Sequence, residues 1–180
     1  MAMTTADEIV AFWRDAGRAR WFNGGEAFDL ECRERLLDDH HAAARRERED
    51  WLGSADGALA LLILLDQIPR NVFRGSGHAF ATDGLALHYA RRIVDAGVDA
   101  RIEPALRAFA YLPFEHSEAL DDQHEAVRLF AALGDAEYAR YAVAHREVIE
   151  RFGRFPHRNR ALGRVSTPKE QAWLDAGGGF

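Results

Sequence analysis

Residues 58–65, ALALLILL, are an uninterrupted apolar run that limits the fold more tightly than any other stretch of the chain. A helix without polar side chains on any face has to be buried by other elements on all sides. Alanine and leucine favour helix over strand, and the run is far shorter than the roughly 18 residues of a membrane-spanning helix. The run therefore predicts a buried central helix, which Pro69 should end or kink near Gln67 or Ile68.

Capping signals and helical periodicity divide the rest of the chain into further helices. Thr5 and Glu8 form a capping box, and Thr167 with Glu170 forms another at the start of a short last helix. We expect a charged helix over residues 28–49, and Pro113 should interrupt the helix that Pro104 opens. No alternating Val, Ile and Thr pattern indicates a strand. The sequence thus predicts an all-α array of seven or eight antiparallel helices in a single domain, residues 1–180.

Composition excludes several classes of protein. The chain has 180 residues, a net charge of -6 and a pI near 5.7, which argues against a nucleic-acid binder because phosphate binding needs a basic face. The single cysteine, Cys32, cannot form an intrachain disulfide. The first residues carry no secretory signal, and no apolar stretch can span a membrane. We expect a soluble cytoplasmic protein.

The apolar run continues directly into a polar motif, residues 66–74. Its polar side chains recur at spacings of four, which places them on common helix faces. They are predicted to bind a ligand and are Asp66, Gln67, Arg70, Asn71 and Arg74. The alternative is that they only tie down the end of the helix.

A second motif, residues 111–118, carries carboxylates and a histidine. Glu115 and Glu118 lie on one acidic stripe, and His116 beside them is a candidate general base. No spacing typical of a metal site is present, so no metal is predicted, and the sequence identifies no cofactor. The alternative is that these carboxylates pair with arginines elsewhere in the chain.

The third motif, residues 150–164, reads ERFGRFPHRNRALGR and has no carboxylate after Glu150. Glycine and proline keep it irregular, and irregular backbone over a core often carries function. Phe152 and Phe155 would wall a site, and His145 precedes it on an apolar helix stripe. The candidate ligand-binding residues offer planar donors suited to phosphate or carboxylate. They are Arg154, His157, Arg158 and Asn159.

Four strings of the sequence together resemble one known family. They are LLDQIPRNVFRG (64–75), AFATDGLALHYA (79–90), YLPFEHSE (111–118) and RFGRFPHRNRALGRVSTPKE (151–170). The chain resembles the bacterial helical family called domain of unknown function 924, which is grouped by fold with tetratricopeptide-like proteins. Arg14 departs from the family, which usually has a third aromatic residue there. The resemblance implies a compact right-handed array of antiparallel helices and implies no activity.

Three functions fit these motifs. The first is a pocket for a small anionic molecule, phosphate or carboxylate, with hydrolase or lyase chemistry as an extension; its candidate catalytic residues are Glu115, His116, Glu118 and His145. The second is a tetratricopeptide-like scaffold that holds a peptide partner. The third is a purely structural lattice of arginines and carboxylates. The first function requires that segments 66–74, 111–122 and 145–159 share a single hollow.

Overall fold

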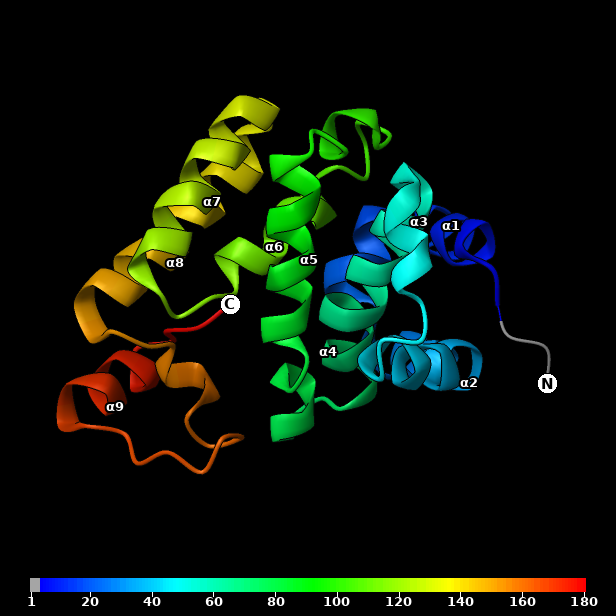
Figure 1. Cartoon of the computed structure of the whole chain (residues 1–180). Coiled ribbons are helices and arrows are strands. Elements are labelled where there is room, and N and C mark those ends of the chain that lie inside the picture. Colours follow the sequence, from blue (N-terminus) through cyan, green and yellow to red (C-terminus); the bar gives the residue numbers. More distant parts are fainter. Residues whose placement is uncertain (1–3) are drawn as a thin grey trace. The chain divides into compact units, whose positions relative to one another are not determined.

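The structure, a computed structural model, describes residues 4–180 and confirms the all-α fold (Figure 1). Over these residues the regular structure is helical, with no strand. The chain divides into two compact units. Unit 1 consists of Met1–Arg74 and His78–Pro113, and unit 2 consists of Gly75–Gly77 and Phe114–Phe180.

Unit 1 contains the helices of the first two thirds of the chain. Its α-helices are α1 (Ala6–Asn23), α2 (Gly25–Ala44), α3 (Ala55–Leu62), α4 (Ile68–Val72), α5 (Asp83–Asp95) and α6 (Ala108–Glu115), of which the last two residues belong to unit 2. Short 3-10 turns lie at Glu49–Gly53, Gly77–Phe80 and Asp99–Arg101. Helix α2 ends before the expected residue 49, because the backbone turns left-handed at Arg46, where φ is 65°.

The apolar run lies at the centre of unit 1, as predicted. Every residue from Ala58 to Leu65 is buried. Aromatic side chains of other helices complete this core. The Trp13 ring lies 5.8 Å from the ring of Phe28 and meets that of Phe109 edge-on at 5.5 Å.

Of the two effects expected of Pro69, an end or a kink near Gln67 or Ile68, the structure excludes the end and shows a change of helical register instead. The chain passes from α3 through a π-helical turn, Ile63–Gln67, into α4, which contains Pro69. The N–H of Ile68 donates to the carbonyl of Ile63, five residues back. The wider turn lets the helix continue past the proline. Pro113 likewise lies inside α6 without interrupting it.

Pro69 has no N–H, so a carbonyl one turn earlier loses its partner. That carbonyl belongs to Leu65 in α-helical register and to Leu64 in π-helical register. Both receive a side-chain hydrogen bond instead. Thr82 Oγ1 donates to the carbonyl of Leu65 at 2.5 Å, and His40 Nδ1 lies 2.8 Å from that of Leu64. Neighbouring elements therefore supply the donors that the proline removes.

Unit 2 contains α7 (Leu120–Leu133), α8 (Ala136–Phe152) and α9 (Pro168–Asp175), with a 3-10 turn at Pro156–Arg158. Helices α7 and α8 lie side by side (Figure 1). Gly134 ends α7, with a left-handed φ of 80°, and Asp135 caps α8. The capping box of Thr167 and Glu170 is confirmed. Val148, Ile149 and Phe155 form an apolar cluster in this unit.

Replacing Thr82 tests the compensation for Pro69. Thr82→Val removes the donor and leaves the buried carbonyl of Leu65 with less hydrogen bonding, so the free energy of unfolding should fall by about 1–2 kcal/mol. Thr82→Ser keeps the hydroxyl and is the matched control, with an expected loss below about 0.5 kcal/mol. Urea unfolding measures both variants. Equal losses in the two would contradict this role of Thr82.

Candidate functional site

In unit 1, the polar motif that follows the buried helix is bound to its own surroundings. Arg70 donates to both carboxylate oxygens of Asp83, at 2.9 and 3.0 Å, and to the backbone carbonyl of Asp66 at 2.5 Å. Gln67 Nε2 donates to the Asp66 carboxylate at 2.6 Å, and Asn71 Nδ2 donates to the Gln67 carbonyl at 3.1 Å. These contacts satisfy carbonyls of the π-helical turn and its exit.

Arg70 forms ion pairs with two carboxylates, those of Asp66 and Asp83. Burial lowers the pKa of its guanidinium, but the charges of Asp66 and Asp83 outweigh that effect and raise the pKa above its ordinary value. A ligand anion would have to displace a bidentate carboxylate from this arginine. The geometry therefore favours the structural alternative for Arg70 and its neighbours.

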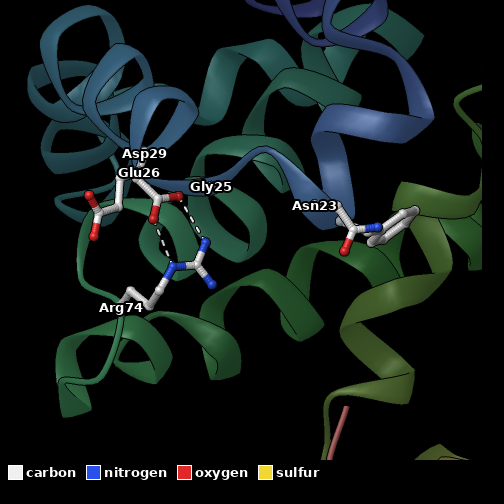
Figure 2. A pocket seen from close by; sticks show the side chains of 6 residues that line it. Asn23, Gly25, Glu26, Asp29 and Arg74 are labelled. Atoms are coloured by element: carbon white, nitrogen blue, oxygen red, sulfur yellow. Dashed lines mark hydrogen bonds and ion pairs between the residues drawn. The ribbon is translucent and has the colours of Figure 1, made fainter.

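Arg74 lies at an open hollow of about 400 Å³ (Figure 2). It forms a bidentate pair with Asp29, at 2.7 and 2.8 Å, and this hydrogen bonding raises the pKa of the guanidinium. The other residues that line the hollow are Phe22, Asn23, Gly25 and Glu26. With Glu26 and Asp29 beside one arginine, the hollow has no excess of positive charge for an anion.

In unit 2, Glu118 anchors the irregular segment 153–167. Its carboxylate accepts from the backbone N–H of Phe155 at 2.8 Å and from both terminal nitrogens of Arg164, at 2.7 and 2.9 Å. Arg164 also donates to the Phe155 carbonyl and to Asn159 Oδ1, both at 2.9 Å, and Asn159 donates to Ser166 at 3.0 Å. Glu118 and Asn159, two predicted site residues, thus hold the backbone of the third motif.

Arg154 and Glu170 form a second anchor of the same segment. The guanidinium donates to both Glu170 oxygens, at 2.6 and 2.8 Å, and to the Val165 carbonyl at 2.9 Å. Glu170 also accepts from the backbone N–H of Thr167 at 2.7 Å. The hydrogen bonds from Arg154 and then from Thr167 lower the pKa of Glu170 to about 2. Two nitrogens of the guanidinium, Nε and Nη2, are therefore engaged.

His145 lies at the centre of a different cluster in unit 2. It is 6% exposed, and its Nδ1 lies 2.9 Å from the carbonyl oxygen of Tyr141 and 3.4 Å from Oε1 of Glu115. A carbonyl can only accept, so Nδ1 carries the proton of the neutral ring and Nε2 keeps the lone pair. The shorter contact to Tyr141 is the hydrogen bond that orients the imidazole.

The charge state of His145 follows from its burial. Burial is the largest cause that lowers its pKa, to about 3, and electrostatic interactions with His116, His157 and Arg158 lower it further. The hydrogen bond to Tyr141 opposes them without reversing the shift. At neutral pH the imidazole is uncharged, so its contact with Glu115 is not an ion pair.

Aromatic and cationic groups surround this ring. The His145 imidazole stacks on the ring of Phe180, with centroids 3.6 Å apart and planes at 15°, and meets Phe155 edge-on at 5.6 Å. The Arg158 guanidinium lies 4.6 Å from the centre of the Phe155 ring, and the centre of the His157 ring lies 5.5 Å from that same point. The His145 cluster is defined here as Glu115, His116, His145, His157 and Arg158.

The structure thus sorts the predicted site residues into two groups. Those that lie together are the five of the His145 cluster. Those engaged in helix or loop anchoring are Asp66, Gln67, Arg70, Asn71, Arg74, Glu118, Arg154 and Asn159. Segment 66–74 belongs to unit 1 and the His145 cluster to unit 2. That three motifs share one hollow stays a prediction.

Several important partners were missed from the sequence. Asp29 and Asp83 pair with arginines of the first motif, and nothing local marks them for this. Arg164 was visible as a cation of the third motif. Phe180 follows three glycines, and no periodicity ties it to His145.

The described residues give no support for a metal site, a membrane-spanning helix or a reactive thiol. Over residues 4–180, no group of three or more His, Cys, Asp and Glu side chains is arranged to hold a metal ion. In the same part of the chain, no helix combines the length and apolar character needed to cross a bilayer. Cys32 is buried, which raises the pKa of its thiol to about 12 and leaves it unreactive.

Fold and site define an all-helical protein in which arginine–carboxylate pairs brace irregular loops beside a histidine cluster. The chain belongs to the bacterial protein family of unknown function DUF924, whose family model matches residues 9–178. Its fold is also that of a solved protein of unknown function from Agrobacterium tumefaciens, with a TM-score of 0.92 and 46% identity over 95% of this chain and 97% of that one. No curated protein matches the chain.

The Arg154–Glu170 anchor predicts a pH dependence of stability. A carboxyl whose pKa falls from 4.5 to about 2 on folding stabilises the native state above pH 4.5, and this contribution is lost as the pH falls toward 2. Glu170→Gln should lower the free energy of unfolding by about 2 kcal/mol at neutral pH. Urea unfolding at several pH values should show the gap between the variant and the original chain narrowing below pH 4.5.

Glu150→Gln is the matched control for this variant. Glu150 pairs with Arg146 at 3.2 Å, but its side chain is 45% exposed, so the loss should stay below about 0.5 kcal/mol. A gap for Glu170→Gln that stays constant down to pH 2 would contradict the assignment.

Proposed function

We propose that the protein binds a small anionic molecule, through a phosphate or carboxylate group, at the His145 cluster of unit 2. The observation that carries the proposal is that two imidazoles and one guanidinium gather around the buried imidazole of His145. They belong to His116, His157 and Arg158. Imidazole and guanidinium N–H groups are directional donors for oxyanions, and a buried setting strengthens such contacts.

Three other arginines that were predicted to bind an anion already bind carboxylates of the protein. Arg70, Arg74 and Arg154 each hold a carboxylate with two nitrogens. An incoming anion would have to break such a fork, which costs more than the new contact returns. Arg158 is 6% exposed, and its planar group lies over the Phe155 ring. This contact preorganises its guanidinium beside the cluster.

The geometry supports binding more directly than catalysis. A ring with a pKa of about 3 is neutral at pH 7 but is a weak proton acceptor, whereas an efficient general base has a pKa near the working pH. A bound anion next to His145 would raise that pKa, because an opposite charge favours the imidazolium. Hydrolase or lyase chemistry by Glu115, His116, Glu118 and His145 is the extension of the proposal that depends on this shift.

The structural role is the second candidate, and it has its own supporting observation. The bidentate pairs of Arg154 with Glu170 and of Arg164 with Glu118 tie segment 153–167 to its surroundings. This lattice accounts for much of the third motif. The anion-binding proposal concerns other side chains, the imidazoles of the His145 cluster.

Inorganic phosphate is the probe that tests the proposal. Titration into the labelled full-length chain should shift the NMR signals of residues 155–159, since these residues flank the expected anion. Arg158→Gln should weaken phosphate binding by at least about tenfold, which corresponds to about 1.4 kcal/mol. Arg158→Lys keeps the charge and should recover part of the affinity.

Arg160→Gln is the matched control, because Arg160 is exposed and lies in the same segment. It should change the phosphate affinity by less than about twofold. No signal change in the segment at about 20 mM phosphate, or equal effects of the Arg158 and Arg160 variants, would overturn the proposal.

A further inference from the structure

We propose that Phe180 is a displaceable cover of the His145 cluster and that its ring holds the place of a flat aromatic ring of the ligand. The inference rests on the proposed function and narrows the ligand to an aromatic anion, one that joins an aromatic ring to a phosphate or carboxylate group.

The ring contacts of Phe180 are those of a ligand in an aromatic box. One face of its ring stacks on His145 at 3.6 Å, close to parallel. Two further rings stand nearly perpendicular to it: that of Phe155 at 6.3 Å and 88°, and that of His157 at 5.7 Å and 82°. Parallel and edge-on packing are the arrangements that aromatic rings prefer. The position therefore accepts a flat ring of this size.

Phe180 is nevertheless only partly buried. The residue is 52% exposed, whereas His145, on which its ring stacks, is buried. The covering ring thus gains only part of the stabilisation that full burial would give. A ligand that offers the same ring together with an anionic group would make more contacts with the cluster than Phe180 does.

The backbone before Phe180 is suited to a hinge. Gly178 is fixed, since its N–H donates to the Trp173 carbonyl at 2.9 Å and a Cβ there would collide with the Trp173 ring. Gly179 has a φ of 145°, a conformation that other residues rarely adopt. Rotation about this one glycine can lift the Phe180 ring away while Gly178 stays anchored to α9.

The ligand class follows from the two kinds of group that meet here. The stacked position selects a flat ring, and the His157 imidazole and the Arg158 guanidinium beside Phe155 offer N–H donors to a negative group. Phosphate and carboxylate share this chemistry, and phenyl phosphate is a simple probe that contains both parts. Cyclohexyl phosphate has the same anion on a ring that cannot stack, so it isolates the contribution of the aromatic ring.

Phe180→Ala removes the cover, and Val165→Ala is the matched control, because Val165 is an exposed apolar residue of the same unit. Phe180→Ala should bind phenyl phosphate about tenfold more tightly than the intact chain does. The affinities for cyclohexyl phosphate and inorganic phosphate should change by less than about twofold. Val165→Ala should behave like the intact chain with all three probes.

The ring protons of His145 give a direct readout of stacking. A stacked aromatic ring moves their NMR signals upfield, so Phe180→Ala should shift them downfield. Phenyl phosphate should restore the upfield position in this variant, and cyclohexyl phosphate should not. A thermal unfolding curve of each variant verifies that it is folded before the titrations.

Each outcome separates the inference from the proposed function. If Phe180→Ala raises the affinities for phenyl and cyclohexyl phosphate equally, the inference that the ligand is aromatic is overturned, while the proposed anion site stands. If Phe180→Ala changes no affinity, the cover is overturned. If none of the three phosphates binds either chain, the proposed function fails together with the ligand class.

Discussion

A proline inside a fully buried helix sets the main constraint on unit 1. Pro69 removes a backbone donor where no water can replace it, and a buried carbonyl without a partner is costly. The chain meets this constraint with side chains from elsewhere. Thr82 and His40 bind the carbonyls of Leu65 and Leu64. Much of the polarity in this core therefore has a structural explanation.

Unit 2 faces a related constraint in its irregular segment. Residues 153–167 contain little regular structure, so their backbone groups need partners outside a helix ladder. Glu118 and Glu170 provide them, and Arg164 and Arg154 carry the connections onward. The His145 cluster lies in the same unit and is a separate group of polar side chains around one buried imidazole. The proposed anion site lies at this cluster.

The sequence predicts most of the fold because the relevant forces are local. The run at 58–65 and the capping boxes at Thr5 and Thr167 depend on residues a few positions apart, and the structure confirms all three. The prolines were predicted less well. Whether Pro69 ends a helix depends on donors such as Thr82, which come from another element.

The candidate site is less predictable because partners that are distant in sequence decide it. The sequence shows arginines and carboxylates in abundance, but not that Arg154 takes Glu170 or that Arg74 takes Asp29. It also places His145 on an apolar stripe without showing that Phe180 lies over its ring. Pairing and stacking of this kind become visible only when the tertiary structure is known.

The central claim is that His145 is a buried, neutral imidazole whose Nδ1–H donates to the Tyr141 carbonyl and around which the site is built. Nitrogen NMR of the histidine side chains tests it most directly. The account predicts the Nδ1–H tautomer for His145 and no titration of this ring between about pH 5 and pH 8. An Nε2–H tautomer, or a titration midpoint near the ordinary value of about 6.5, would contradict it.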